Sequence, residues 1–405
     1  MKQIKVFLFT VSAIAALLFA ACGKSDEPAI PGNPADPGET VKPVEPADPG
    51  EESERTVLVY MAANNNLSAL STKDIDEMKT AADKIGSGSR LIVYQALQYK
   101  QPRLFEIMAD GSERELATYP SGTASVTIAQ MRRVIEDMRK AAPASGYGIV
   151  LWSHATGWIN DSGTITDPDL NTPAAQPLSF GYDSPGRKRM SLRALAQAID
   201  LGDMQWDFIY FDCCHMATVE VAYQLRHLTP VIVASPTELG EDGMPYDRNL
   251  QHFFSPEPDL EAAARNTFTS YTDGSVSPSY GCAISVIRTS ALDRLADACA
   301  AIHSSGAILP ENYQRVPYFR TIIMSSGLYD MFHYYSSLEG VATDLKDEFT
   351  RAFNAAVSLS LTTQRVYGLA ADNFHGLATN IVTSDSDITT YRYDETDWYA
   401  DVLSK

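Results

Sequence analysis

The chain has 405 residues with 51 acidic and 32 basic side chains, which give a formal net charge of −19. This acidity argues against nucleic-acid binding, because phosphates require clustered lysine and arginine. A hydrophobic content of 45% supplies a large core and excludes wholesale disorder, and five cysteines are too few for a disulfide scaffold.

The first 21 residues have the pattern of a signal peptide. Two lysines precede the apolar run Val6–Ala20, which is too short for a comfortable membrane span. The run ends in Phe-Ala-Ala-Cys at Cys22, which resembles the acylation site of bacterial lipoproteins, although Phe19 replaces the usual leucine. We expect Cys22 to carry a lipid anchor in the outer membrane, with the protein exposed at the cell surface. An ordinary secretory signal is the alternative.

Residues 22–55 are predicted to form the lipidated N-terminus and a disordered tether. The stretch 27–54 is rich in proline, glycine and acids, and it repeats the sequence Pro-Ala-Asp-Pro-Gly-Glu. Such a segment has almost nothing apolar to bury, so we expect an extended spacer. Most of the negative charge remains in the folded part that follows.

From residue 56 onward, apolar runs typical of buried strands alternate with segments of helical periodicity. We predict strands over 56–62, 90–97, 147–153, 206–212, 230–235 and 281–287. We predict helices over 68–84, 123–142, 191–201, 216–228, 292–303 and 336–357. This alternation favours an α/β fold, with a mostly parallel central sheet and helices on both faces. We assign 56–290 to an α/β core and 291–405 to a helix-rich C-terminal part packed on it.

Two predicted strands end in reactive side chains. His154 directly follows one strand, and the pair Cys213–Cys214 directly follows another. In a parallel sheet both sets lie at the carboxyl edge, where ligands bind. A thiol beside an imidazole suits nucleophilic catalysis, and a helix beginning near Met216 would favour the thiolate. Two structural cysteines and an incidental histidine are the alternative.

Four motifs resemble the clostripain family of cysteine peptidases. They are Tyr-Met-Ala-Ala-Asn-Asn-Asn-Leu at 60–67, Leu-Trp-Ser-His-Ala-Thr-Gly-Trp at 151–158, Phe-Asp-Cys-Cys-His-Met at 211–216 and Ala-Ser-Pro-Thr-Glu-Leu-Gly-Glu-Asp-Gly-Met-Pro-Tyr at 234–246. Looser matches occur at 376–378 and 394–403. The resemblance covers most of 56–403 and implies a caspase-like three-layer fold.

The resemblance also implies roles for particular residues. The nucleophile would be Cys214, and His154 would act as general base and then as general acid. The backbone N–H groups of Cys214 and Ala155 would form the oxyanion hole. Ala155 stands where the family commonly has glycine, and Cys213 stands where it usually has alanine. Cys213 is expected to be a small buried side chain, although a vicinal disulfide with Cys214 would silence the site.

The resemblance implies cleavage of proteins or peptides after arginine or lysine. Asp212 matches the family's carboxylate under that basic side chain, although an aspartate at a strand end also serves as a helix N-cap. The loop after the fifth strand offers Glu238, Glu241 and Asp242, of which Asp242 is the favoured second carboxylate.

Self-processing is predicted in the segment 159–190, since relatives are often cleaved there by their own specificity. Arg187, Lys188 and Arg189 are the candidate sites, and a solvated basic turn is the alternative.

No other motif competes strongly with this interpretation. His375 precedes a glycine but is a weak candidate for the base, and no zinc or nucleotide motif is present. We predict no cofactor. The family's namesake is calcium-dependent, but this sequence has no Asp-x-Asp-x-Asp-Gly loop, so calcium stays open. The alternative function is a catalytically inactive, membrane-tethered binding lipoprotein on the same scaffold.

Overall fold

A computed structural model describes residues 40–47, 52–158, 180–184, 188–277, 279–308, 328–371, 374–381, 388 and 392–404. All of these belong to one structural unit, which spans Gly32–Lys405. Cys22, the stretch 159–179 and Arg187 lie outside the described residues. The signal peptide, the lipid anchor and most of the processing segment therefore stay predictions.

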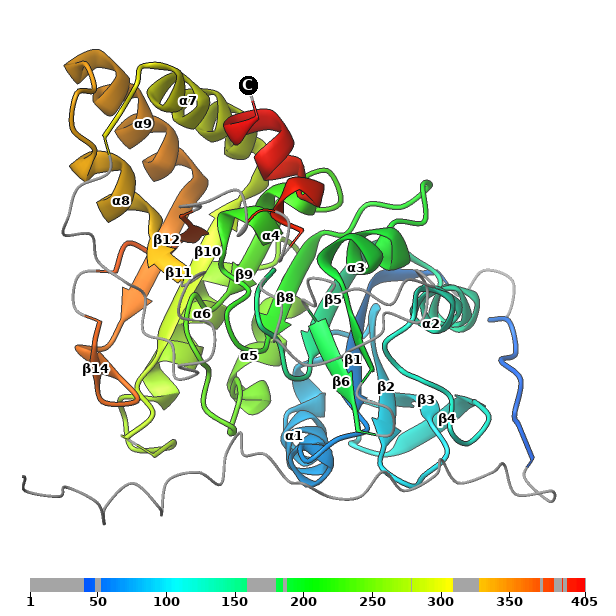
Figure 1. Ribbon diagram of the computed structural model, residues 1–405. Helices are drawn as coiled ribbons and strands as arrows, with labels where there is room; N and C mark the ends of the chain where they lie inside the picture. Colours follow the sequence, from blue (N-terminus) through cyan, green and yellow to red (C-terminus); the bar gives the residue numbers. More distant parts are fainter. Residues whose placement is uncertain are drawn as a thin grey trace, which may run out of the picture. The chain divides into compact units, whose positions relative to one another are not determined.

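A mixed sheet of nine strands organises the described part of the chain, in the order β12-β10-β9-β8-β5-β1-β2-β3-β4 (Figure 1). The central strands are parallel: β1 (Ser53–Ala63), β2 (Ser89–Leu97), β5 (Ala144–Trp152), β8 (Phe208–Asp212) and β9 (Val231–Ala234). Antiparallel strands flank them: β3 (Arg103–Ile107) and β4 (Glu113–Thr118) on one side, β10 (Ala283–Arg288) and β12 (Val357–Thr362) on the other. The predicted α/β fold is confirmed, and its sheet is mixed: the central strands are parallel and the strands on both sides are antiparallel.

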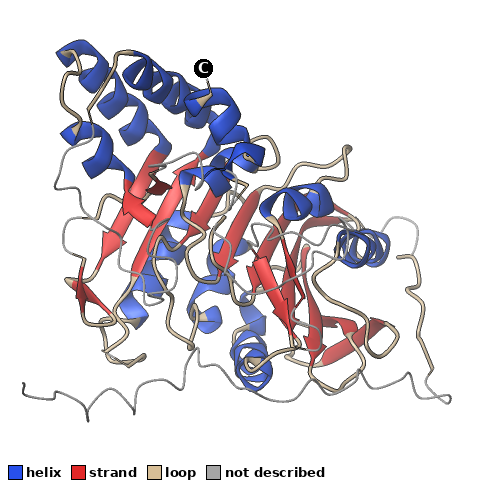
Figure 2. Ribbon diagram, in the orientation of Figure 1, coloured by secondary structure: helices blue, strands red, loops and turns tan. Residues whose placement is uncertain are grey.

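Helices cover both faces of the sheet, as Figure 2 shows. Leu58 and Tyr60 of β1 enter one hydrophobic cluster, whereas Val57 and Val59 enter another, because successive strand residues point to opposite faces. The first cluster includes residues of α2 (Ile128–Ala141), α3 (Leu192–Ile199), α4 (Val219–Gln224), α7 (Leu292–Ser304) and α9 (Thr343–Ala356). The second includes residues of α1 (Ser68–Thr80), α5 (Tyr246–Phe253) and α6 (Leu260–Ser270).

Smaller elements lie between these layers or beside them. Three two-stranded pairs occur in the described residues: β6 (Phe180–Asp183) with β7 (Lys188–Met190), β11 (Leu328–Asp330) with β15 (Ala378–Asn380), and β13 (Arg365–Val366) with β14 (Leu369–Ala370). Helix α8 spans Met331–Ser337, and short helical turns span Ala82–Lys84, Thr289–Ala291, Tyr393–Glu395 and Tyr399–Leu403.

All six predicted strands occur, but several details of the prediction were wrong. Strand β10 is antiparallel to β9, and the short strands β3, β4 and β12 were missed, as were helices α5 and α6. The helix predicted over 336–357 begins only at Thr343, because α8 ends at Ser337 and the chain turns at Gly340, whose φ is +76°. The helix predicted from residue 216 begins only at Val219.

The last part of the predicted tether lies against the folded body. Lys42 and Thr118 of β4 exchange hydrogen bonds: the Lys42 N–H donates to the Thr118 hydroxyl at 2.7 Å, and the Thr118 N–H donates back to the Lys42 carbonyl at 2.9 Å. Farther on, the Ala47 N–H donates to the carbonyl of Lys140 in α2 at 2.9 Å. Residues 40–47 are thus extended but ordered, so the prediction of disorder does not hold for these eight residues.

The C-terminal part is integrated into the same sheet. Strand β12 follows α9 and pairs with β10 of the predicted core. The two predicted parts therefore share one sheet and one hydrophobic cluster. None of the described helices has the length and apolarity that crossing a membrane requires.

Candidate active site

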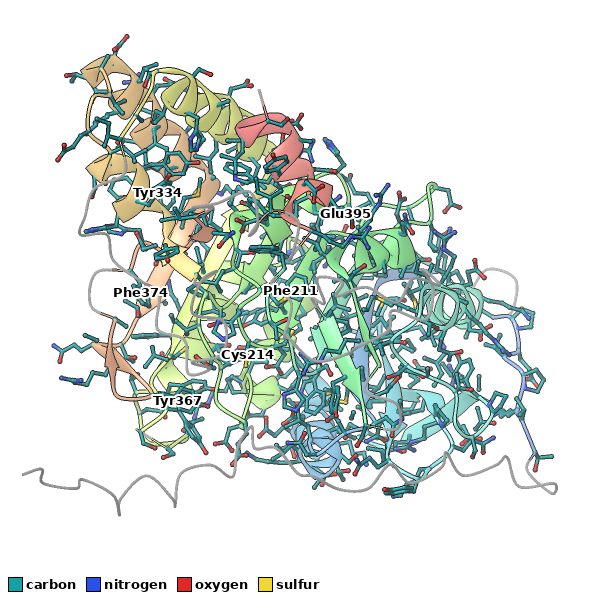
Figure 3. The ribbon with its side chains drawn as sticks, viewed as in Figure 1. Phe211, Cys214, Tyr334, Tyr367, Phe374 and Glu395 are labelled. Carbon is teal, nitrogen blue, oxygen red and sulfur yellow. The ribbon has the colours of Figure 1, made fainter. Side chains whose placement is uncertain are left out.

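Three strand ends meet at one edge of the sheet. Trp152 of β5 is in register with Asp212 of β8 on one side and with Met61 of β1 on the other. His154 and Cys214 each follow these register partners by two residues, so both leave the sheet at its carboxyl edge. Figure 3 labels Cys214. The prediction that the imidazole and the thiol share this edge is confirmed.

His154 is held by two neighbouring segments. Its Nε2 lies 2.8 Å from the side-chain oxygen of Asn66, in the turn after β1. Its ring meets the ring of Tyr182 edge-on at 6.3 Å between centroids, and its carbonyl accepts the N–H of Gly181 at 2.9 Å. The imidazole therefore lies between the turn after β1 and the β6–β7 hairpin.

The loop that carries Cys214 is anchored to the loop after β9. The next residue, His215, has a left-handed backbone with φ of +59°, and its N–H donates to the carbonyl of Thr237 at 2.9 Å. The Ala217 N–H donates to the carbonyl of Ser235 at 2.9 Å. The half-buried thiol of Cys214 lies 3.8 Å from the Leu239 carbonyl oxygen. These bonds fix the backbone on the C-terminal side of the thiol.

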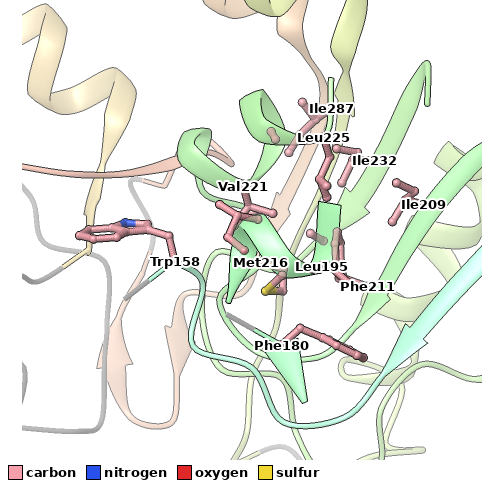
Figure 4. Packing of buried hydrophobic residues seen from close by; sticks show 14 of the residues in the cluster. Trp158, Phe180, Leu195, Ile209, Phe211, Met216, Val221, Leu225, Ile232 and Ile287 are labelled. Carbon is pink, nitrogen blue, oxygen red and sulfur yellow. The ribbon is translucent and has the colours of Figure 1, made fainter. Parts of the chain in front are cut away.

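Buried apolar side chains also anchor the loop that carries Cys214. Met216 is fully buried in the cluster that also contains Phe211 of β8, Val221 of α4 and Phe180 of β6 (Figure 4). Helix α4 begins at Val219 with Thr218 as its N-cap and is six residues long. The predicted support of a thiolate by a helix beginning at residue 216 is therefore wrong, because four residues separate Cys214 from the helix.

Asp212 lies on the opposite face of β8 from Cys213 and is only 5% exposed. Its carboxylate accepts the Met244 N–H at 3.1 Å and the Tyr246 hydroxyl at 3.2 Å. Burial, together with the charge of Glu77, raises the pKa of Asp212 to about 7, although the two hydrogen bonds oppose this shift. The two donors belong to the loop after β9 and to α5. Asp212 therefore makes tertiary contacts here, whereas the N-cap alternative would have it bond to the helix that follows it.

A second buried carboxylate lies near Asp212. Asp74 of α1 accepts the indole N–H of Trp152 at 2.7 Å, while its other oxygen has no hydrogen-bond partner among the described residues. Burial and then the charge of Asp212 raise the pKa of Asp74 well above its usual range. Two desolvated carboxyls thus influence each other on this side of the sheet.

The three acids of the loop after β9 differ in their surroundings. Asp242 forms an ion pair with Lys73 of α1 at 2.6 Å and stays partly exposed. Glu238 lies 3.6 Å from Nε2 of His215, and Glu241 accepts the Tyr280 hydroxyl at 3.2 Å. Asp242, the favoured second carboxylate, is already neutralised by a lysine, whereas Asp74 was missed because nothing in its helical pattern distinguishes it.

The predicted processing residues belong in part to the β6–β7 hairpin. Arg189 is a β7 residue, is 9% exposed and packs over the ring of Tyr182 at 5.2 Å. Lys188 pairs with Asp183 in the same hairpin. A paired, buried position is a poor substrate for a peptidase, so Arg189 is better described as a residue that packs on Tyr182 beside His154.

His375 has a carboxylate partner of its own. Its Nδ1 lies 2.8 Å from a carboxylate oxygen of the buried Asp330, and its ring packs against Phe332 at 4.6 Å between centroids. In the described residues, no group of three or more His, Cys, Asp or Glu side chains is arranged to hold a metal ion.

Comparison with known proteins decides the family. A model of the clostripain family matches residues 59–400. The chain belongs to the clostripain family. It is therefore a cysteine peptidase, and the resemblance of the four motifs is confirmed at the level of the family. No curated protein matches the chain.

Solved structures of clostripain-family, or C11, proteases share this caspase-like fold. An inactive zymogen C11 protease from Parabacteroides distasonis is 28% identical with a TM-score of 0.71, covering 87% of this chain and 98% of that one. A secreted C11 cysteine protease from Bacteroides thetaiotaomicron, in complex with an irreversible peptide inhibitor, is 25% identical with a TM-score of 0.73, covering 86% and 99%. A further secreted C11 protease structure from that organism is 23% identical with a TM-score of 0.74, covering 87% and 99%, and shows the fold alone.

Two departures from the clostripain-family pattern are accommodated by the backbone. Ala155 is not among the residues with positive φ; the left-handed position of this turn is Gly157, with φ of +68°. Alanine therefore fits after His154 without strain. Cys213 is 3% exposed, its thiol donates to the Leu151 carbonyl at 3.3 Å, and burial raises its pKa well above the usual range. Cys213 and Cys214 do not form a vicinal disulfide.

Proposed function

We propose that this clostripain-family peptidase hydrolyses peptide bonds after arginine or lysine, with Cys214 as the nucleophile and His154 as the general base. One observation carries the assignment: adjacent parallel strands in register bring these two residues to one edge of the sheet. Cys213, the only other thiol in this loop, points into the core and holds its proton strongly. A buried thiol with a raised pKa is a poor nucleophile.

In this mechanism the imidazole of His154 takes the thiol proton of Cys214, and the sulfur attacks the carbonyl carbon of the scissile bond. The N–H groups of Cys214 and Ala155 stabilise the negative charge on the carbonyl oxygen. The protonated imidazole then donates to the departing amine, which leaves a thioester on Cys214. His154 next removes a proton from a water molecule, whose oxygen attacks the thioester and regenerates the thiol.

The preference for a basic side chain is supported by the buried carboxyls. Asp212 and Asp74 lie in desolvated positions where both charged forms are disfavoured. A guanidinium or ammonium group entering beside them would favour their ionised forms and form charge-assisted hydrogen bonds. Peptide substrates are supported by the peptide inhibitor bound to the related secreted C11 protease.

The test compares fluorogenic peptides that differ only at the residue before the cut, under reducing conditions. We expect hydrolysis after arginine and lysine, and at least about 100-fold slower hydrolysis after citrulline, which keeps the shape of arginine without its charge. Cys214→Ala should abolish turnover, whereas Cys213→Ala should keep most of it. Loss of activity in Cys213→Ala with retention in Cys214→Ala would reverse the assignment. Absence of turnover on every peptide would favour the inactive binding lipoprotein instead.

We also propose self-processing within 159–190 and a lipid anchor on Cys22. Processing is supported by a related C11 protease described as an inactive zymogen. With Arg189 buried and Lys188 paired with Asp183 in the hairpin, Arg187 is the favoured cleavage position of the three. Wild type should yield two fragments where Cys214→Ala stays intact, and identical single bands would contradict processing.

The lipid anchor has its own test. Cys22→Ala should abolish incorporation of a labelled fatty acid and release the protein from the outer membrane; an unchanged membrane fraction would contradict the anchor.

A further inference from the structure

We propose that Asn66 is a positioning residue for His154. Its side-chain oxygen holds the imidazole in the tautomer with a proton on Nε2, which leaves Nδ1 as the basic nitrogen that serves Cys214. This inference deepens the proposed function and rests on it for the role of His154. The sequence offers Asn64–Asn66 only as a turn after a strand, so the tertiary contact is the evidence.

The contact is the observation from which we infer the tautomer. Nε2 of His154 lies 2.8 Å from Oδ1 of Asn66, a normal hydrogen-bond distance. An amide oxygen can only accept a hydrogen bond, so Nε2 must donate and carry the proton. In a neutral imidazole the other nitrogen, Nδ1, then keeps its lone pair and can receive a proton.

The turn that presents Asn66 is fixed by its neighbour rather than by Asn66. The buried side chain of Asn65 donates to the carbonyls of Ala62 at 3.0 Å and Tyr182 at 2.7 Å, and it accepts the Leu67 N–H at 2.9 Å. These bonds join the end of β1 to the β6–β7 hairpin. Asn66 can therefore be replaced without dismantling the turn.

The side chain of Asn66 makes few contacts that a substitution would remove. It is exposed, and in the described part of the chain its only side-chain hydrogen bond is the one to His154. The half-buried Asn64, two residues earlier, has no side-chain hydrogen bond among the described residues, although its carbonyl accepts the Ser184 N–H at 2.7 Å. Asn64 is thus a matched control for charge and side-chain size in the same turn.

The titratable groups that the described residues place around His154 determine the expected effect of a charge at position 66. Tyr182 faces the imidazole from the hairpin, and Arg189 lies behind Tyr182. Cys214 and the His215–Glu238 pair lie on the loops at the same edge. A carboxylate replacing the Asn66 amide would be the new anion in contact with Nε2, so it should stabilise the imidazolium form of His154.

The test reads the imidazole directly and does not depend on turnover. In Cys214→Ala protein with ¹⁵N-labelled histidine, long-range ¹H–¹⁵N spectra report the tautomer of His154, which is assigned by its loss in His154→Ala. We expect the Nε2–H form to dominate, and Asn66→Ala to reduce its share while Asn64→Ala leaves it unchanged. Asn66→Asp should raise the pKa of His154 by about one unit, and Asn64→Asp by clearly less.

Kinetics on the otherwise wild-type enzyme complete the test. Asn66→Ala should lower kcat by about 10-fold to 100-fold with KM nearly unchanged, because substrate binding does not involve this amide. Asn64→Ala should keep both constants. An unchanged tautomer together with an unchanged kcat in Asn66→Ala would overturn the inference while leaving the peptidase assignment standing. A wild-type enzyme that turns over no peptide would instead contradict the proposed function.

Discussion

Gly157 lies directly against the carbonyl oxygen of His215, so the loop that follows the proposed base touches the loop that carries the proposed nucleophile. A Cβ atom on Gly157 would stand 2.8 Å from that oxygen. Gly157 also has φ of +68°, and His215 has φ of +59°. Two left-handed residues in contact thus set the spacing between the loops that carry His154 and Cys214.

Gly157→Ala should therefore cost both stability and activity. The methyl group strains the left-handed backbone by about 1 kcal/mol and also pushes the His215 carbonyl, which moves Cys214. We expect the free energy of unfolding to fall by about 2–3 kcal/mol and kcat to fall at least about tenfold. Denaturant titration and steady-state kinetics measure the two effects.

Gly202→Ala is the control for the glycine prediction. Gly202 has φ of +76°, but a Cβ there would meet no atom within 4 Å. It should show only the backbone cost of about 1 kcal/mol and unchanged kcat. Equal effects of the two substitutions would mean that the contact with His215 does not matter.

Asp212→Asn should change how stability depends on pH. The folded-state pKa of Asp212 is raised to about 7, whereas a carboxyl in an unfolded chain titrates near about 4. Between these values the native state binds more protons, so this group makes the wild type lose stability as pH rises from about 4 to about 7. Asparagine removes that loss.

The stability of the variant relative to wild type should therefore increase by about 3 kcal/mol between pH 4.5 and pH 8. Urea unfolding at both pH values gives the difference, in which any constant packing cost of the substitution cancels. A difference that is independent of pH, or that falls with pH, would contradict the raised pKa of Asp212.

Asp74 should matter more than Asp242 for the preference for basic residues. Asp74 is buried near Asp212 with one carboxylate oxygen unpartnered in the described residues, whereas Asp242 is already paired with Lys73. We expect Asp74→Asn to lower the ratio of kcat/KM for arginine over citrulline substrates about tenfold, and Asp242→Asn to change it less than about threefold. The reverse order would restore Asp242 as the second carboxylate.

Glu220 of α4 should be essential for stability. The fully buried carboxylate accepts the Asn380 N–H and the Tyr393 hydroxyl, both at 2.8 Å, and so joins the helix after the Cys214 loop to the C-terminal region. Glu220→Ala leaves both donors without this acceptor and should lower the free energy of unfolding by about 3 kcal/mol. The exposed helix residue Glu136 is the control, and Glu136→Ala should change stability by less than about 0.5 kcal/mol. Similar losses in both variants would contradict the role of Glu220.

Much of the fold follows from local sequence pattern. The run Val57–Ala63 is buried on both faces of β1, and such uninterrupted apolar runs predict central parallel strands because helices must cover both faces. The short edge strands, such as β3 with five residues, carry no comparable run and were missed. Their pairing depends on neighbours rather than on their own composition.

The candidate site also has features that the sequence predicts and others that only the tertiary structure reveals. The sequence by itself determined that His154 and Cys214 end two buried strands, that residues 59–400 have the clostripain-family pattern, and that Asp212 stands two residues before the thiol. Only the tertiary structure decided that Asn66 contacts His154 across 88 positions of sequence, and that Asp74 lies near Asp212 while Asp242 pairs with a lysine. Strand ends are encoded by local hydrophobic periodicity, whereas side-chain partners depend on strand order and on loop conformations such as the left-handed His215, which arise only when distant segments pack together.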